Sequence, residues 1–422
     1  MRPLAGGIVN VTVRAVRSPL IRPIETTQGG TEKGSQGFRD LGKLSGYESL
    51  IVKYAPPYAA LAGAQAPFDR VRQTVEANAL ALFAFDGPLV PLPRASDVLV
   101  PRLIHHDKDS HLLIIEDLGN LTPLLDYLSP SPPGANQCQV QAILSNENLW
   151  RSIGRRLGHF FADLHLESTL ETVTTYFGAN DLPGFKNQNM IDLVPDVAVL
   201  PIKRHLEKYN TPDFMNLSEI VEQDYERGIS DEERSFIIRD LWPGGILIDS
   251  SDPLALMPKL GVIDWEFSGP AQALAAVSMH PRSATYSAVL ALIEGINDSY
   301  HARSLANGGS LWTLAPSGTS DPPHPMSPFA RIFRSAIIIH GREIINNAIG
   351  NDWGGFCADP GNENENNGLV LSLVRTGVQL LRLAGNNTAE FVDSQNWKQL
   401  LQSTEAKVIV GLFLNECQLS GL

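Results

Sequence analysis

Cysteine and long apolar runs are both scarce in this sequence. It has three cysteines, which are widely separated and lack the paired spacing of a zinc site: Cys138, Cys357 and Cys417. Dispersed thiols argue against a disulfide framework and are typical of a reducing compartment. No apolar run approaches the roughly 18 residues of a membrane span, and the first residues lack the core of a signal peptide. The sequence therefore predicts a cytoplasmic protein that does not enter a membrane.

Positive charge is also in deficit. The 422 residues include 33 lysines and arginines against 46 aspartates and glutamates, which gives a formal net charge of −13. A nucleic-acid-binding surface needs a basic patch, so this balance argues against a nucleic-acid partner. A ligand that carries phosphates would need a local cation or a metal ion. The hydrophobic content of 43% is enough for a substantial core.

Periodicity predicts a small β-rich lobe followed by a larger helical one. Residues 6–16, "GGIVNVTVRAV", and 48–55, "ESLIVKYA", have the β-branched residues and alternation of strands. Residues 69–83, "DRVRQTVEANALALF", have helical spacing after an initial aspartate, and 111–119, "HLLIIEDLG", form a strand ended by glycine. Later segments are mostly helical, above all 149–165, "LWRSIGRRLGHFFADLH". We expect an α+β fold with lobes at residues 1–119 and 120–422.

Lys53 lies in the second predicted strand, and Glu76 lies on the helix that follows it. Taken singly, Lys53 could be a solvated or edge residue, and Glu76 could pair on the helix surface with Arg72. Taken together, they match the way in which nucleotide kinases hold a strand lysine with a helix glutamate. That ion pair aims the ammonium at the α and β phosphates.

A single acid stands between two apolar runs in residues 236–248, "FIIRDLWPGGILI". Asp240 follows the first run, and a Pro-Gly-Gly turn precedes the second run. This pattern is typical of a catalytic loop between two strands, so Asp240 is a candidate catalytic base.

Two further acids, Asp264 and Glu266, lie in the segment "VIDWEF". On a strand, residues i and i+2 point the same way, so both carboxylates could hold one hard cation. The alternative is a strand end with two solvated acids. The apolar neighbours favour the metal site, because an unpaired carboxylate at the end of a buried run would be costly.

Gly6 and Gly7 precede the first predicted strand. A glycine pair lets backbone amides approach phosphate oxygens, although such a pair is more often only a turn. The order of the parts adds information. A glycine pair, a strand lysine, a helix glutamate, a hinge strand, a loop aspartate and a final metal-binding aspartate follow one another as they do in kinases.

With these parts in order, the chain resembles the aminoglycoside phosphotransferase-like kinases, a branch of the protein-kinase-like fold. Within that branch it is most similar to the group of methylthioribose kinases and fungal 4-hydroxytryptamine kinases. The resemblance covers about residues 4–271 and is carried by these motifs: "LAGGIVNVTVR", "IVKYAPPY", "TVEANAL", "LIIEDLG", "LGHFFADLH", "DLWPGGILI" and "VIDWEFSGPA".

The resemblance implies a bilobal fold with ATP between the lobes and an acceptor pocket in the helical lobe. It also implies a role for each candidate. Lys53 contacts the nucleotide phosphates with Glu76 as its anchor, and Gly6 and Gly7 approach those phosphates. Glu116 and Leu118 belong to a hinge that contacts the nucleotide. Asp240 is the base that orients the acceptor hydroxyl, and Asp264 and Glu266 hold Mg²⁺.

Four positions depart from the family pattern. Gly245 stands where the family has an asparagine that binds the second metal ion, but methylthioribose kinases also lack it and carry an Asp-x-Glu motif, which Asp264 and Glu266 match. Ile238 replaces a histidine, and Leu274 replaces an acid that braces the catalytic loop. For Arg239 we expect only a surface position or a local ion pair.

Two functions follow from these observations. The first is an ATP- and Mg²⁺-dependent phosphotransferase that acts on a hydroxyl of a small molecule. The alternative is a degenerate protein of kinase fold that binds nucleotide or a partner without turnover.

Overall fold

The computed structural model describes most of the chain, but not all of it. The described residues are 2–4, 9–17, 46–128, 143–227, 234–249, 251, 255, 257–272, 286–308, 322–350 and 363–414. Several residues singled out in the sequence lie outside these ranges: Gly6, Gly7, Leu274 and the cysteines at 138, 357 and 417.

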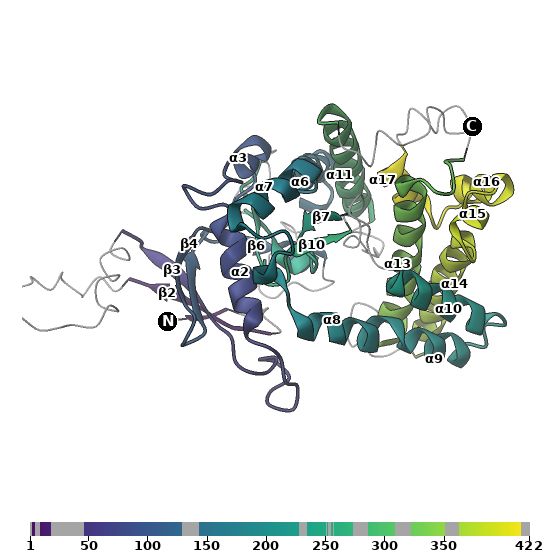
Figure 1. The fold of residues 1–422 in the computed structure, drawn as a ribbon, viewed down its shortest axis with the longest axis horizontal. Helices are drawn as coiled ribbons and strands as arrows, with labels where there is room; N and C mark the ends of the chain where they lie inside the picture. The colour runs from purple at the N-terminus through teal and green to yellow at the C-terminus, as the bar shows by residue number, and fades with distance from the viewer. Residues whose placement is uncertain are drawn as a thin grey trace, which may run out of the picture.

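A five-stranded antiparallel sheet and one long helix form the N-terminal lobe (Figure 1). The order of the strands is β1 (Arg2–Pro3), β2 (Val11–Val16), β3 (Ser49–Tyr54), β5 (Leu112–Glu116) and β4 (Leu103–Asp107). Helix α2 (Val71–Ala81) packs on this sheet. At its first residue, the amide of Val71 donates a hydrogen bond to the carboxylate of Asp69 (2.9 Å). The predicted strands at 48–55 and 111–119 and the predicted helix at 69–83 are confirmed, with ends that are one to three residues shorter. The first predicted strand, residues 6–16, begins only at Val11, and its residues 6–8 lie outside the described residues.

The C-terminal lobe is mostly helical and holds two small sheets. One sheet pairs β7 (Arg234–Ile237) with β10 (Gly269–Gln272), and the other has the order β6 (Thr122–Pro123), β8 (Ile246–Ile248), β9 (Leu260–Val262). Its described helices are α4 (Leu124–Leu128), α6 (Glu147–Leu164), α7 (Glu167–Phe177), α8 (Gln188–Val194), α9 (Pro201–Lys208), α10 (Phe214–Glu226), α11 (Tyr286–Ala306), α13 (Pro328–Gly350), α14 (Glu363–Ala384), α15 (Thr388–Phe391), α16 (Ser394–Gln402) and α17 (Lys407–Phe413). A short helix, α3 (Pro91–Ser96), lies in the N-terminal part of the chain between α2 and β4. The predicted bilobal α+β fold is confirmed.

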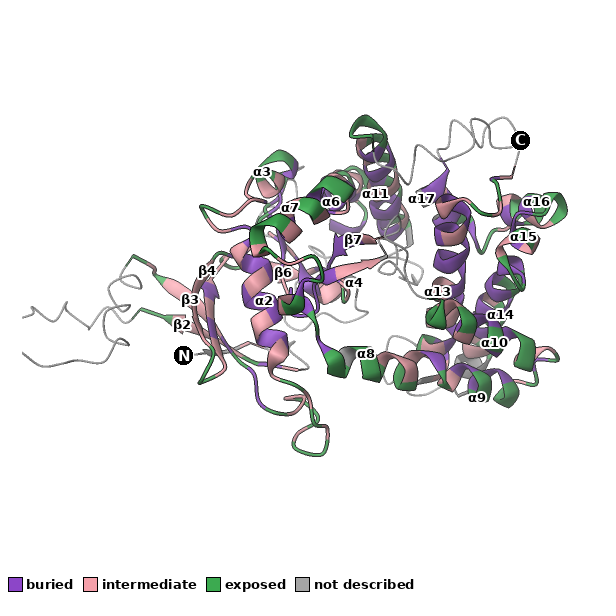
Figure 2. Ribbon diagram, viewed as in Figure 1, coloured by how far each residue is buried: buried purple, intermediate pink, exposed green. Residues whose placement is uncertain are grey.

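The C-terminal lobe extends away from the N-terminal sheet. Helices α13, α14 and α10 lie together at the end of the molecule opposite β2 and β3, and α8 runs between that group and the body (Figure 1). Buried residues are concentrated along α6, α11 and α13 (Figure 2). Within the residues that the structure describes, no helix combines the length and the apolar character needed to span a membrane.

Trp265 links the two lobes through an aromatic cluster. It is fully buried, and its ring centroid lies 4.8 Å from that of Phe83, just after α2, and 6.2 Å from that of Phe160 on α6. Its indole nitrogen donates a hydrogen bond to the carbonyl of Val262 at the end of β9 (3.1 Å). This cluster therefore fixes the position of the two residues beside it, Asp264 and Glu266.

Glycines allow α6 and α11 to pack with their backbones in contact. A Cβ atom added at Gly154 of α6 would lie 2.1 Å from the carbonyl oxygen of Leu292 on α11, and one at Gly158 would lie 2.4 Å from that of Ile296. Real Cβ atoms do not approach so closely, so any larger residue forces the helices apart. This packing supports α6, on which the aromatic cluster rests.

We expect Gly154→Ala to lower the free energy of unfolding by about 3 kcal/mol, because overpacking a tight helix contact cannot be relieved by a side-chain rotation. Urea denaturation followed by circular dichroism measures the change. Gly368→Ala on α14 is the matched control, since an added Cβ there meets nothing within 4 Å. The control should stabilise by roughly 0.5–1 kcal/mol. Equal stabilities for the two variants would contradict the proposed backbone contact.

Candidate active site

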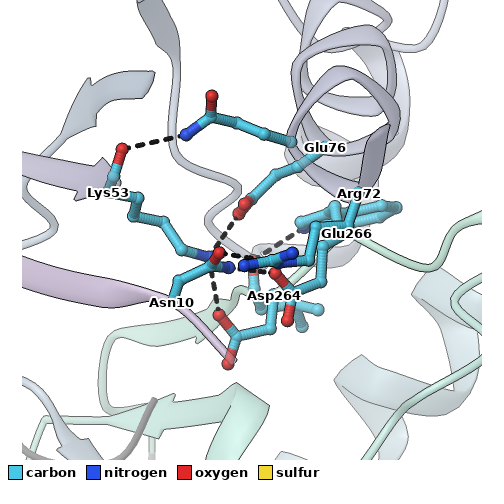
Figure 3. Close-up of polar contacts among 9 residues, drawn as sticks. Asn10, Lys53, Arg72, Glu76, Asp264 and Glu266 are labelled. Atoms are coloured by element: carbon cyan, nitrogen blue, oxygen red, sulfur yellow. Dashed lines mark hydrogen bonds and ion pairs between the residues drawn. The ribbon is translucent and has the colours of Figure 1, made fainter. Parts of the chain in front are cut away.

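Lys53 and Glu76 form the buried ion pair that the sequence predicts. The Nζ atom of Lys53 lies 2.7 Å from Oε1 of Glu76, and the two side chains are 6% and 2% exposed (Figure 3). Lys53 reaches inward from β3 because its neighbours on the strand alternate between the two faces of the sheet. The alternatives for both residues, a solvated lysine and a surface glutamate paired with Arg72, are wrong.

The same ammonium also reaches the C-terminal lobe. Lys53 Nζ lies 3.0 Å from Oδ1 of Asp264. Burial alone would lower the pKa of Lys53, but the carboxylates of Glu76, Asp264 and Glu266 outweigh it and raise that pKa. Lys53 is therefore a permanent cation that contacts one carboxylate from each lobe, Glu76 and Asp264.

Asp264 and Glu266 lie beside each other near Lys53, but not for the reason that we predicted. Strand β9 ends at Val262, and Asp264 has a left-handed backbone with φ of 62°. The parity of a strand therefore does not apply, and the prediction that both acids lie on a strand is wrong. The turn after β9 places both acids at the site instead. Aspartate is one of the few residue types other than glycine that tolerate this left-handed conformation.

Glu266 is held by two residues that the sequence analysis did not identify as site residues. The side-chain amide of Asn10 donates a hydrogen bond to Oε2 of Glu266, and Oδ1 of Asn10 accepts one from Nε of Arg72 (3.0 Å). All three residues are buried. For Arg72, the sequence offered one sign of a site position: it lies four residues before Glu76 and therefore on the same face of α2. The contact between Asn10 and Glu266 is long-range, so no pattern in the neighbouring residues could predict it.

Asp240 lies in the predicted loop, between β7 and the short turn that leads into β8. The residue is exposed, so its carboxylate is accessible to a substrate. Protein nevertheless surrounds it closely enough that burial, together with the charge of Asp264, raises its pKa to about 6. Asp240 is thus ionised at neutral pH but more basic than an ordinary aspartate.

Two hydrogen bonds hold this loop, one to the segment that carries Asp264 and one to β10. The amide of Ile263 donates to the carbonyl of Gly245 (2.9 Å), and Nη2 of Arg239 donates to the carbonyl of Pro270 on β10 (2.7 Å). Burial lowers the pKa of Arg239. The expectation that Arg239 makes a surface contact or a local ion pair is therefore wrong, since its guanidinium is a partly buried brace between the loop and β10.

The hinge side chains are held by arginines of the N-terminal lobe. Arg102 contacts both carboxylate oxygens of Glu116 at 2.9 Å, and Arg14 contacts both oxygens of Asp117 at 2.8 and 2.9 Å. Leu118 lies close to β9, where a Cβ at Gly261 would be 2.8 Å from its Cδ1 atom. The backbone amide of Glu116 is also engaged, since it donates to the carbonyl of Arg102 (2.9 Å), and the Leu118 side chain faces β9.

The charges at the site leave room for a divalent cation. Burial raises the pKa of Glu266 to about 8, and the charges of Glu76 and Asp264 add to the shift. Lys53 and Arg72 lower this pKa by less than burial raises it, so Glu266 is largely protonated at neutral pH and a bound cation would displace that proton. The described residues contain no group of three or more histidine, cysteine or acidic side chains arranged to hold a metal ion. Two carboxylates suffice for Mg²⁺, however, because this ion takes its other ligands from phosphates and water. Asp264 and Glu266 fit that role.

Comparisons with known proteins confirm the predicted resemblance. The chain is 25% identical over 256 residues to a 4-hydroxytryptamine kinase of Psilocybe cyanescens, covering 58% of this chain and 64% of that protein. It is 38% identical over 77 residues to a methylthioribose kinase of Bacillus cereus, covering 18% of this chain and 17% of that protein. The chain therefore spans less than two thirds of the length of these relatives. No protein-family profile matches it.

Solved structures of small-molecule kinases are also similar to this chain. A choline kinase of Streptococcus pneumoniae has 12% sequence identity and a TM-score of 0.32, with 79% of this chain and 86% of that chain covered.

Removing both partners of the buried pair should cost less than the sum of the two single losses. We expect Lys53→Met and Glu76→Leu each to lower the free energy of unfolding by about 3–5 kcal/mol, because each leaves a buried charge unpaired. The double variant should be more stable than the sum of the two losses predicts, by about 1–3 kcal/mol in urea denaturation. The control is Lys186→Met, whose exposed partner is Asp181 and whose loss should cost at most about 1 kcal/mol. Additive losses at Lys53 and Glu76 would argue against the pair.

Proposed function

We propose that this chain is an ATP-dependent phosphotransferase that transfers a phosphoryl group to a hydroxyl of a small molecule. The observation that carries the proposal is the contact of Lys53 with both Glu76 (2.7 Å) and Asp264 (3.0 Å). It joins the lysine that we propose binds phosphate to the aspartate that we propose binds the metal ion, across the two lobes. The resemblance to kinases that are named for small molecules with hydroxyl groups supports the same function.

Each residue then has one task. Lys53, fixed by Glu76, would bind the α and β phosphates. Asp264 and Glu266 would hold Mg²⁺, which neutralises charge on the phosphates when it is bound. Asp240 would orient the acceptor hydroxyl and accept its proton while the hydroxyl oxygen forms a bond to the γ phosphorus. The bond from that phosphorus to the bridging oxygen breaks, and ADP leaves. The hinge at Glu116 and Leu118, and Gly6 and Gly7, would contact the nucleotide.

The substrate class follows from charge and from the relatives. A protein with a net charge of −13 favours a cationic acceptor over an anionic one. The first panel should therefore contain hydroxylated amines, with hydroxylated sugars as the second group. The dispersed cysteines support a cytoplasmic location.

One observation favours the alternative, a protein that binds nucleotide without turnover. Position 245 is a glycine, so the catalytic loop supplies no second metal ligand there. Thermal unfolding with ATP separates the two functions. A shift in Tm that is identical with and without Mg²⁺, combined with no turnover on the panel, would favour the binding protein.

Asp240→Asn should lower kcat by about 10²–10⁴, because the amide cannot accept the proton of the acceptor hydroxyl. ADP release in the presence of the acceptor measures the loss. Asp249→Asn is the matched control, because this acid lies just after β8 and its carboxylate accepts hydrogen bonds from Ser251, including one from the Ser251 amide (3.0 Å). Full activity of Asp240→Asn would remove Asp240 as the base.

Activity should fall in mild acid. The pKa of Asp240 is raised to about 6, so the proton-accepting form is present above that pH and is lost as the pH falls through it. We expect kcat/KM for the acceptor to be level near neutral pH and to drop about tenfold per unit well below pH 6. The profile should be recorded at saturating nucleotide, with circular dichroism at each pH to exclude unfolding. A midpoint near 4 would show an ordinary aspartate.

A further inference from the structure

Asn10 occupies an unusual place between the two lobes. It lies just before β2, is 6% exposed, and is separated by 256 positions from Glu266, to which its side-chain amide donates a hydrogen bond. Its Oδ1 atom faces Nε of Arg72 at 3.0 Å (Figure 3). One amide therefore has its acceptor on a guanidinium and its donor on a carboxylate. Only one orientation of the asparagine satisfies both contacts.

Arg72 prevents this amide from moving. Its side chain is fully buried, and its other nitrogens donate to the carbonyls of Val9 and Pro56 at 2.9 Å and of Asp69 at 2.6 Å. The guanidinium thus joins the segment before β2, the segment after β3 and the start of α2. Displacing it would leave several buried groups without partners, which is costly.

We propose that Asn10 is a positioning residue for the metal site. It holds Oε2 of Glu266, whereas among the described residues Oε1 of Glu266 has no hydrogen-bond partner and remains for a cation. Because Asn10 belongs to the N-terminal lobe and Glu266 to the C-terminal lobe, this contact makes cation binding depend on the lobes being together. The inference rests on the proposed function, in which Glu266 and Asp264 hold Mg²⁺.

The test measures metal binding rather than turnover. Mn²⁺ serves as a paramagnetic stand-in for Mg²⁺, and the signal of free Mn²⁺ is followed by electron paramagnetic resonance at saturating ADP. We expect Asn10→Ala to weaken Mn²⁺ binding by about 10–100-fold, as is typical when a partner of a metal ligand is removed. Affinity for ADP without metal, measured by calorimetry, should change little.

Asn78→Ala is the matched control. Asn78 lies on α2, and its side chain also donates a hydrogen bond to a distant segment, the carbonyl of Gly184 at 2.9 Å, but it has no contact with the site carboxylates. Its removal should leave Mn²⁺ affinity unchanged. Asn10→Ser keeps a shorter donor and should give an intermediate affinity, which also provides a readout if Asn10→Ala does not fold.

A double variant decides whether Asn10 acts through Glu266. In a Glu266→Gln background, Asn10→Ala should cause little additional loss of Mn²⁺ affinity. An equal loss in both backgrounds, or no loss in the wild-type background, would overturn the inference while leaving the kinase proposal intact. Absence of any Mn²⁺-dependent ADP binding by the unaltered chain would instead refute the proposed function, and this inference with it.

Discussion

The structure depends on one buried charge balance, in which Lys53 lies among the carboxylates of Glu76, Asp264 and Glu266. Each acid comes from a segment that is distant in the sequence from the lysine, so β3, α2 and the turn after β9 must meet at one point. Burying an unpaired charge costs several kcal/mol, about as much as the net stability of many domains. A fold in which β3, α2 and the turn after β9 do not meet would therefore be unstable. The lobes are joined by electrostatics at the site and by the ring of Trp265 beside it.

Two hydrogen bonds hold the loop that carries Asp240 to neighbouring segments. Position 274 holds a leucine instead of a bracing acid and lies outside the described residues. Arg239 joins the loop to β10, and the amide of Ile263 joins Gly245 to the segment before Asp264. Misplacement of a base by about 1 Å can cost on the order of a hundredfold in rate. The two contacts restrict such a displacement of Asp240.

Local pattern was sufficient to predict the fold and the residues that project from regular elements. Lys53 on its strand, Glu76 on its helix and Asp240 between two strands follow from periodicity and turn residues. The conformation of Asp264 could not be predicted, because the chain leaves the strand before it and a strand-parity argument then fails. The contact between Asn10 and Glu266 spans 256 positions and has no local signature. Contacts of this kind depend on tertiary packing, which the spacing of residues along the chain does not reveal.

The two proposed metal ligands differ in a way that bears on how a cation would bind. The side chain of Asp264 is 30% exposed and already contacts Lys53, whereas Glu266 is only 6% exposed and already accepts a hydrogen bond from Asn10. Asp264 can therefore meet an incoming ion from solvent, while Glu266 can contribute only an oxygen that its partners leave uncovered. Because Gly245 adds no ligand from the loop, phosphates and water must complete the coordination. On this reasoning, the cation would bind mainly together with the nucleotide rather than before it.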